Sequence, residues 1–289
     1  MSWRETLTQF TAENQAAGFP FTPGPHWQHI NRLFREWMET KGIGDIETQI
    51  YNSKFATPCA YLPRTYLKFM AGENWKEFMP PNLSELGFAC VLLYQQLRER
   101  DRLGILGTVA PAASRDSDVV FEVNDILISW DLLLSVETLY TIDEICPLFE
   151  GGTLRIADLG AGWGRIGHAL LNFVRNKHLH YSIFDLPESR LLSTLYLPTV
   201  IPKSSNYDIL DSGFLRRVPN KSIDVLISIA SFQEMTEEQR LAYYSLISEK
   251  AKYLYSVQKG DVYTMYPGKI VLSRHPLWSN ACHEVICEL

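Results

Sequence analysis

The feature that most constrains this chain is a turn with three glycines at alternate positions, between an apolar segment and an amphipathic one. Residues 154–158 have the pattern of a short buried strand, and Gly160, Gly162 and Gly164 follow them. A helical pattern then begins near Ile166. Glycine reaches positive φ without steric penalty and lets a ligand lie against the backbone. Because the first turn of a helix leaves N–H groups unpaired, this segment predicts a ligand-binding strand–turn–helix unit.

Strands and helices are predicted to alternate after this turn. A capping box, Thr236 with Gln239 three residues later, marks the start of a helix. Apolar runs with strand character lie at 181–185, 223–229, 253–257 and 269–272. Such alternation builds a parallel sheet with helices on both faces, so the predicted class is α/β.

The chain before the turn is predicted to be mostly helical. Apolar residues recur at helical spacing in three segments, 27–38, 83–99 and 126–140, whereas the Gly- and Pro-rich segment 18–25 is predicted to be irregular and 108–117 an exposed loop. We therefore divide the chain into a helical N-terminal or cap region, residues 1–122, and a ligand-binding domain, residues 123–289.

The composition is that of an ordinary globular protein. A net charge of -6 argues against a long basic surface for nucleic acid, and it argues equally against an anionic membrane. The sequence contains no apolar stretch of the length that crosses a bilayer, and its N-terminus lacks the pattern of a signal peptide. The 5 cysteines form no CxxC pair, which indicates reduced thiols and a cytoplasmic location.

Two classes of ligand use a glycine turn of this kind. A dinucleotide requires GxGxxG, and Arg165 occupies the last glycine position, which disfavours an NAD-dependent oxidoreductase. S-adenosylmethionine instead has an ammonium group that Asp158, at the strand end, can meet. Asp185 ends the next predicted strand, where nucleoside-binding sheets hold ribose hydroxyls. The structural alternatives are a turn without ligand and, for Asp185, a surface carboxylate that caps the next turn.

Four segments together resemble the class I S-adenosylmethionine-dependent methyltransferases, most closely the sugar O-methyltransferase family: residues 156–165, 184–188, 195–197 and 231–235. The resemblance covers roughly residues 123–257. It implies a Rossmann-like methyltransferase sheet and S-adenosylmethionine as cofactor. The implied cofactor-binding residues are Asp158, Gly160, Ala161, Gly162, Gly164, Asp185, Leu186, Asp211 and Ser231. Asp211 is assigned to the adenine amino group, with Asp208 as the competing residue.

The candidate catalytic residues are found by comparison with a related family in which a histidine is the base. Plant-type small-molecule O-methyltransferases, which these segments also resemble, have a histidine base after the fourth strand, and Gln233 stands at that position. Because an amide cannot accept the proton, we expect Glu234 to be the base and Gln233 to hydrogen-bond the acceptor. His275 is a second candidate base. The structural alternatives are a helix-entry carboxylate for Glu234 and a turn histidine for His275.

The predicted function is the S-adenosylmethionine-dependent methylation of a hydroxyl on a small molecule, a sugar or a glycosylated metabolite. The alternatives are a methyltransferase of a polyketide or phenol, and a methyltransferase-fold binding protein without catalysis. No metal is predicted, because Glu234, Glu237 and Glu238 have the pattern of helix N-terminal charge. The helical half is expected to cover the site and to set acceptor specificity. The oligomeric state is left open, with a homodimer as one option.

Overall fold

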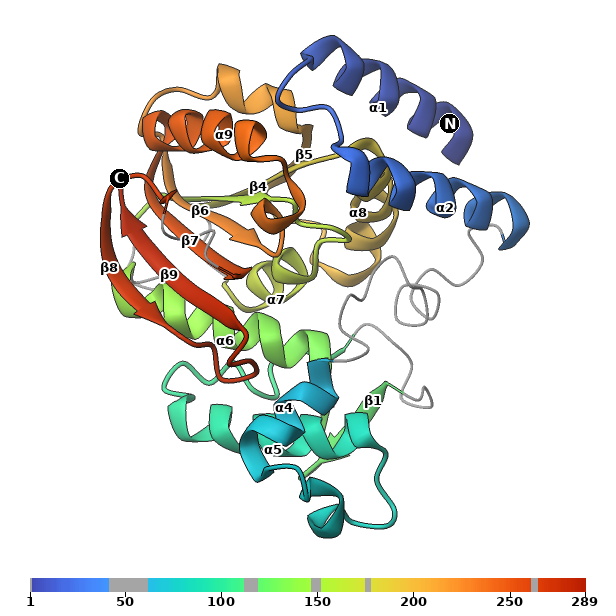
Figure 1. Cartoon of the computed structure of the whole chain (residues 1–289), viewed down its shortest axis with the longest axis vertical. Coiled ribbons are helices and arrows are strands. Elements are labelled where there is room, and N and C mark those ends of the chain that lie inside the picture. The colour runs from blue at the N-terminus through green and yellow to red at the C-terminus, as the bar shows by residue number, and fades with distance from the viewer. Residues whose placement is uncertain (1, 42–61, 112–118, 147–151, 175–177, 261–264) are drawn as a thin grey trace.

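The computed structural model describes residues 2–41, 62–111, 119–146, 152–174, 178–260 and 265–289. Within these residues, seven strands form one sheet in the order β5-β4-β3-β6-β7-β9-β8 (Figure 1). The strands are β3 (Leu154–Leu159), β4 (Leu179–Asp185), β5 (Tyr207–Asp211), β6 (Ile223–Ile229), β7 (Ala251–Lys259), β8 (Lys269–Arg274) and β9 (Cys282–Glu288).

The chain changes direction across the sheet at β3. This strand pairs in parallel with β4 on one side and with β6 on the other, and ligands of open α/β sheets bind at the carboxyl end of such a switch point. The predicted α/β class with a Rossmann-like sheet is confirmed. The sheet is mixed rather than wholly parallel, because β9 lies antiparallel between β7 and β8. Neither β5 nor β9 was predicted from the sequence.

Helices cover both faces of the sheet, as predicted. Because side chains alternate along a strand, Ile156 on β3 packs into the core beside α6 and α7, whereas Ala157 and Leu159 pack into the core beside α9. Figure 1 shows α9 and α6 on opposite sides of the sheet. The helices of this half are α6 (Trp130–Ile145), α7 (Arg165–Phe173), α8 (Pro187–Val200) and α9 (Glu237–Lys250), with the short 3-10 helices η3 (Ser212–Arg217) and η4 (Phe232–Glu234).

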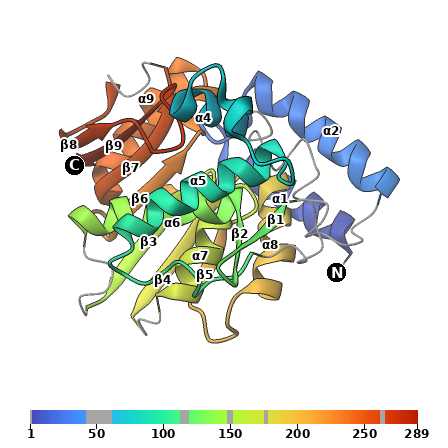
Figure 2. The same cartoon turned by 90° about the horizontal axis from the view of Figure 1, so that it is seen from below.

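The N-terminal elements lie in two separate places. Helices α1 and α2 lie beside α8, where Arg35 is 2.7 Å from Glu188 and Arg190 is 2.9 Å from Glu13. Helices α4 and α5 instead pack together, and α5 lies against α6 (Figure 2). The elements are α1 (Trp3–Ala17), α2 (Pro25–Lys41), α4 (Leu62–Ala71), η2 (Trp75–Phe78), α5 (Glu85–Arg100), β1 (Val120–Val123) and β2 (Ile126–Ser129).

One predicted helix begins later than the periodicity indicates. Residues 126–129 form β2, paired with β1, and α6 starts only at Trp130. The reason is the two-residue turn between the strands, in which Asn124 and Asp125 have φ of 51° and 64°, as in a tight hairpin. The expected boundary between residues 122 and 123 falls inside β1.

The other helices expected in the N-terminal half are present as α2 and α5, and the Thr236–Gln239 capping box is formed at α9. Part of the expected loop at 108–117 lies outside the described residues, as does Cys59. Cys90, Cys146, Cys282 and Cys287 are free thiols. Among the helices of the described ranges, none has both the length and the apolarity that crossing a membrane requires.

Candidate active site

The glycine turn has the backbone geometry that its sequence predicts. Gly160, Gly162 and Gly164 have φ of 77°, 62° and 92°, values that side-chain-bearing residues rarely adopt. A Cβ at Gly160 would collide with the Ser231 side chain, whereas one at Gly162 would meet no atom within 4 Å. At Gly160 the turn therefore touches Ser231, in the connection between β6 and η4, and at Gly162 it presents open backbone. Gly164 is the N-cap of α7.

Asp185 joins the end of β4 to this turn. Its Oδ2 accepts a hydrogen bond of 2.7 Å from the Gly162 N–H, and its Oδ1 accepts one of 2.7 Å from the Leu186 N–H. The side chain is buried, and this burial raises its pKa to about 7 in spite of the two backbone donors. Each carboxylate oxygen retains a further lone pair that can accept a bond from a ligand hydroxyl.

Two cavities meet at the glycine turn. The smaller has a volume of about 60 Å³ and the larger about 380 Å³, both measured as the space that the centre of a water molecule can reach. They share six lining residues: Trp27, Gly160, Gly162, Ser189, Ser231 and Glu234. A single elongated ligand can therefore contact the turn from both sides.

The smaller cavity is lined mainly by apolar side chains and by the Asp185 carboxylate. Its lining includes Leu159, Phe184 and Leu186 from the sheet and the segment after β4, and Tyr243 from α9. Residues 20–24 and Trp27 close it from the N-terminal region. The sequence predicts that residues 18–25 are irregular, but it contains no signal that places them at the site, because their contact with the sheet is decided by tertiary packing.

The larger cavity contains charged groups that are not among the predicted site residues. Asp131 of α6 and Arg165 of α7 both line it, together with Trp163, Trp278 and Lys259. Asp131 is buried, which raises its pKa to about 6, and the nearby Arg165 guanidinium partly opposes that rise. In the sequence, Asp131 is recognisable as a carboxylate within the largely apolar segment of residues 126–139.

Glu234 lies at the boundary of the two cavities. Burial raises the pKa of its carboxyl to about 7, and the nearby Trp27 side chain acts in the opposite direction. His26 Nε2 is 3.9 Å from Glu234 Oε1. Gln233 lines the larger cavity, but its Oε1 already accepts a hydrogen bond of 2.7 Å from the Lys259 N–H.

The remaining residues predicted to contact the cofactor fall into two groups. Ala161 lines the larger cavity and Leu186 the smaller one. Ser231 lines both, and its Oγ donates to the Leu159 carbonyl over 3.2 Å. Gly164 lines neither cavity and acts through the turn and the start of α7.

Asp158 and Asp211 do not line either cavity. Asp158 Oδ2 accepts a 2.7 Å bond from the Tyr181 hydroxyl, and burial raises the pKa of Asp158 to about 6. Asp211 caps η3 through the Gly213 N–H and accepts a 3.1 Å bond from Asn14 of α1. The neighbouring Ser212 lines the smaller cavity instead.

His275 is likewise not brought to the cavities. Its Nδ1 lies 2.7 Å from the Cys282 carbonyl, at the connection between β8 and β9. The competing residue Asp208 is 3.0 Å from His180 at the outer strands of the sheet. His168, the histidine of α7, is buried against the Tyr196 hydroxyl, and burial lowers its pKa to about 4. Within the described ranges, no group of three or more His, Cys, Asp or Glu residues has the arrangement of a metal site.

No protein-family model matches the chain, and no curated protein matches it. Similar solved structures include a SAM-dependent methyltransferase from Aquifex aeolicus, 14% identical, with a TM-score of 0.42; the match covers 52% of this chain and 87% of the other. A SAM-dependent methyltransferase from Leishmania major is 12% identical, with a TM-score of 0.40, over 52% of this chain and 70% of the other. Identities this low carry no information about an acceptor.

Proposed function

We propose that this chain is an S-adenosylmethionine-dependent methyltransferase. The observation that carries the proposal is the junction of the glycine turn with Asp185, whose buried carboxylate accepts from the Gly162 N–H at the meeting point of two cavities. A nucleoside with a charged amino-acid tail has the length and the polarity to occupy both cavities. A dinucleotide is disfavoured, because Arg165 replaces the glycine that its motif requires.

The residues of the smaller cavity fit the nucleoside. Asp185 would accept from the ribose hydroxyls, and the apolar side chains of Leu159, Phe184 and Leu186 would contact the base. The cavity is narrow, so the segment of residues 20–24 that closes it must open to admit a nucleoside.

The residues of the larger cavity fit the amino-acid end. Asp131 would pair with the ammonium group and Arg165 with the carboxylate, since the two side chains carry opposite charges beside Gly162 and Ala161. This assignment replaces the ammonium contact expected of Asp158, whose carboxylate is bonded to Tyr181.

When bound, the cofactor supplies an electrophilic methyl group on a sulfonium. Glu234 would remove the proton from the acceptor oxygen, because its carboxyl lies at the junction of the cavities. With a pKa near 7, a large share of it is ionised at neutral pH, and it is a better base than an ordinary carboxylate. Trp163, Trp278 and Trp27 would orient the acceptor and exclude water.

We further propose that the acceptor is a small hydroxylated molecule, a sugar or a glycosylated metabolite. The support is the combination of indole surfaces with the polar groups of Glu234, Lys259 and Gln233 in one cavity of about 380 Å³. Indoles also suit the flat ring of a phenol or polyketide, which is the second candidate class. Gln233 is a weaker candidate for acceptor binding than the sequence indicated, because its oxygen is bonded to Lys259.

Calorimetric titration with S-adenosylhomocysteine tests the cofactor proposal. Gly162→Ala would place a methyl group in the cavity lining, and we expect it to weaken binding at least ten-fold. Gly104→Ala is the matched control, because Gly104 also has positive φ (67°) and open surroundings but lies outside both cavities. Absence of binding by the unsubstituted protein would reject the proposal.

The acceptor is tested with methyl-labelled S-adenosylmethionine and a panel of hydroxylated compounds. The panel contains simple glycosides, glycosylated phenols and free phenols. Product from glycosides supports the sugar assignment, and product from free phenols alone supports the second class. Cofactor binding without product from extracts of the source organism would favour the non-catalytic binding protein.

A further inference from the structure

Two glutamines join the short helix η4 to the end of β7, and we call the pair Gln233 and Gln258 the glutamine clamp. The Gln233 N–H donates to Gln258 Oε1 over 3.3 Å. In return, Gln233 Oε1 accepts from the N–H of Lys259, the neighbour of Gln258, over 2.7 Å. Each of the two segments thus supplies one side-chain acceptor and one backbone donor to the other.

Gln258 is fixed on the sheet side of the clamp. It is 0% exposed, and its Nε2 donates to the Ser228 carbonyl of β6 and to Ser256 Oγ of β7, over 3.0 Å in each case. Because a carbonyl only accepts and a backbone N–H only donates, these partners decide which end of the amide faces η4. The sheet therefore presents the Gln258 oxygen to η4 in one orientation.

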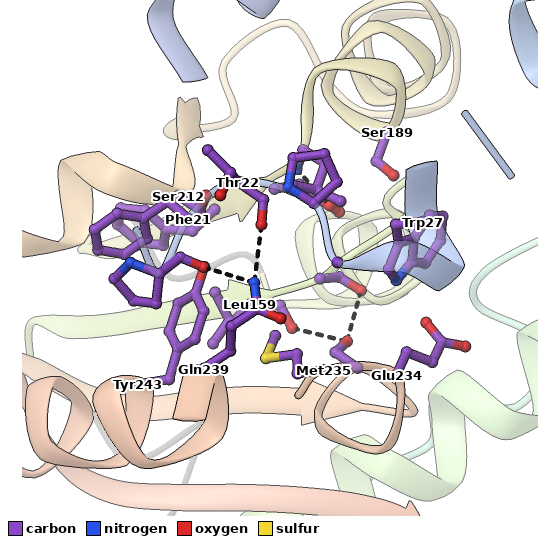
Figure 3. A pocket seen from close by; sticks show the side chains of 18 of the residues that line it. Phe21, Thr22, Trp27, Leu159, Ser189, Ser212, Glu234, Met235, Gln239 and Tyr243 are labelled. Atoms are coloured by element: carbon purple, nitrogen blue, oxygen red, sulfur yellow. Dashed lines mark hydrogen bonds between the residues drawn. The ribbon is translucent and has the colours of Figure 1, made fainter. Parts of the chain in front are cut away.

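The three residues of η4 point in three directions. A 3-10 helix has three residues per turn, so consecutive side chains lie about 120° apart around its axis. Phe232 is 0% exposed and meets the Tyr244 ring edge-on at 4.9 Å, and Gln233 belongs to the clamp. Glu234, the third residue, lines both cavities, and Figure 3 shows its side chain at the same end of the smaller cavity as Trp27. Anchoring the first two side chains therefore sets the direction of the third.

The turn that leads from β6 into η4 needs such anchoring. Ala230 has a φ of 59°, in the left-handed region that residues with a side chain seldom adopt. Its N–H donates to the Val257 carbonyl over 2.8 Å. A backbone conformation of this kind persists where the contacts around it hold it, and the clamp supplies contacts on the η4 side of the turn.

We propose that Gln233 and Gln258 are positioning residues for Glu234, and that the Gln233 side chain serves the clamp rather than the acceptor. The inference rests on the proposed function for the role of Glu234 as the base, but the clamp itself concerns only residues of this chain. Since the oxygen of Gln233 makes the contact with Lys259, a carboxylate at this position can replace the amide. An apolar side chain of similar length cannot.

The first test follows the Glu234 carboxyl without cofactor or acceptor. Burial raises its pKa from the ordinary value of 4.5 to about 7, so a Glu234 that loses its place and reaches water should titrate lower. Gln258→Met removes the acceptor of the Gln233 N–H, while the Ser228 carbonyl keeps its second donor, Ser256 Oγ, at 3.0 Å. We expect the Glu234 pKa to fall by roughly 1 unit, measured by infrared difference spectroscopy against Glu234→Gln in the same background. An unchanged titration would overturn the proposal.

Two substitutions at Gln233 test the other half of the clamp. Gln233→Met loses the oxygen that accepts from the Lys259 N–H, and it should lower the pKa of Glu234 as Gln258→Met does. Gln233→Glu keeps that oxygen and adds a negative charge beside Glu234, which acts in the opposite direction, so the pKa should not fall. An equal fall in both variants would show that the oxygen at 233 does not hold Glu234.

The matched control is Gln96→Met on α5. It makes the same change at a glutamine that accepts from the Tyr66 hydroxyl over 2.9 Å and lies outside both cavities, so the Glu234 titration should stay in place. The titration also reports on the charged groups around Glu234, which none of these variants removes: His26 at 3.9 Å, and Asp131, Arg165, Asp185 and Lys259 in the cavity linings.

The double variant Gln233→Met/Gln258→Met tests whether the two glutamines act as one unit. Because either substitution opens the same clamp, the shift in the Glu234 pKa should be no larger than the larger single shift. Shifts that simply add would show two independent effects and reject the clamp.

The rate of methyl transfer separates the clamp from a contact with the acceptor. With the acceptor that the panel of hydroxylated compounds identifies, and at a pH where Glu234 is ionised, kcat of Gln233→Met should be about ten-fold below that of Gln233→Glu, with KM values within about two-fold. A KM raised ten-fold in both variants, with equal kcat, would place the amide nitrogen on the acceptor and contradict the proposal. The infrared titrations involve no cofactor, so they can fail while S-adenosylhomocysteine binds, and can succeed when it does not.

Discussion

The Asp185 carboxylate accepts a 2.7 Å hydrogen bond from the Gly162 N–H, so the end of β4 holds the open part of the turn that follows β3. The same carboxylate also accepts from the Leu186 N–H and lies in the lining of the smaller cavity. A buried acid that already orders the glycine turn is in place to accept further bonds from the hydroxyls of a nucleoside.

This relationship predicts how cofactor binding depends on pH. The pKa of Asp185 is raised to about 7, so the carboxyl is protonated below that pH and ionised above it. Hydroxyl donors bind the ionised form better, and we expect the affinity for S-adenosylhomocysteine to fall about ten-fold between pH 8 and pH 6. Calorimetry at both values measures it. Asp185→Asn should bind weakly, with the same affinity at both pH values, whereas the control Asp208→Asn should keep the pH dependence of the unsubstituted protein. If the unsubstituted protein binds equally well at pH 6 and pH 8, Asp185 does not accept from the ligand hydroxyls.

The close approach of Gly160 to Ser231 predicts a compensating pair of substitutions. Gly160→Ala introduces a clash with the Ser231 side chain in addition to the cost of positive φ, and should lower the free energy of unfolding by about 2–5 kcal/mol. Ser231→Gly removes the clashing atoms, so the double variant should be more stable than the two single effects predict. Urea denaturation of all four proteins measures this coupling. Simple additivity would show that the close contact is absent.

Glu137 of α6 predicts a pH-dependent loss of stability. Its Oε1 accepts a 2.6 Å bond from the Leu277 N–H, and burial, followed by the nearby Glu284 carboxylate, raises its pKa to about 8. A raised folded-state pKa gives stability that is complete below about pH 4.5 and is lost as the pH rises through 8. Glu137→Gln removes the titrating group but keeps an acceptor for Leu277. Between pH 5 and pH 9 we expect its free energy of unfolding to fall by roughly 3–4 kcal/mol less than that of the unsubstituted protein.

Urea denaturation at both pH values measures this difference in the free energy of unfolding. Glu99→Gln, which changes an exposed glutamate of α5, is the control. Its free energy of unfolding should depend on pH in the same way as that of the unsubstituted protein. If Glu137→Gln followed that trend as well, the buried carboxyl would not be its source.

The proposed base predicts a separation of binding from catalysis. Glu234→Gln should lower the rate of methyl transfer by about 10²- to 10⁴-fold and leave affinity for S-adenosylhomocysteine within about two-fold. In the unsubstituted protein the rate should fall as the pH drops below about 7, because the Glu234 carboxyl becomes protonated there. Glu237→Gln, an exposed neighbour, is the control. The rate is measured with the acceptor that the panel of hydroxylated compounds identifies. If Glu234→Gln transfers methyl groups as fast as the unsubstituted protein, Glu234 is not the base.

Local features of the sequence were sufficient for the centre of the fold. The glycine turn was predictable because positive φ is a property of single residues, and the start of α9 because the Thr236–Gln239 box is local. The β1–β2 hairpin was missed because its strands are four residues each, and their apolar residues also fit a helical period.

Several side chains of the candidate site were not predictable in this way. Asp211, expected in a loop, ends β5 instead. Its carboxylate accepts from Asn14 of α1 and from the Gly213 N–H of η3, and the residue does not line the smaller cavity. In the sequence Arg165 stands out only because it replaces a glycine of the dinucleotide motif, although it lines the larger cavity together with Asp131. The direction in which a side chain points depends on neighbours that are distant in sequence.

The sequence alone determined the α/β class and the turn at residues 160–164, because periodicity and backbone preference are encoded residue by residue. Tertiary structure alone decided that Trp27, far from the turn in sequence, lines the same two cavities as Glu234, and that Gln239 both caps α9 and holds the connection between α1 and α2. The physical reason is that a hydrogen bond between distant segments exists only after packing has brought them together, and no local pattern records which donor will meet which acceptor.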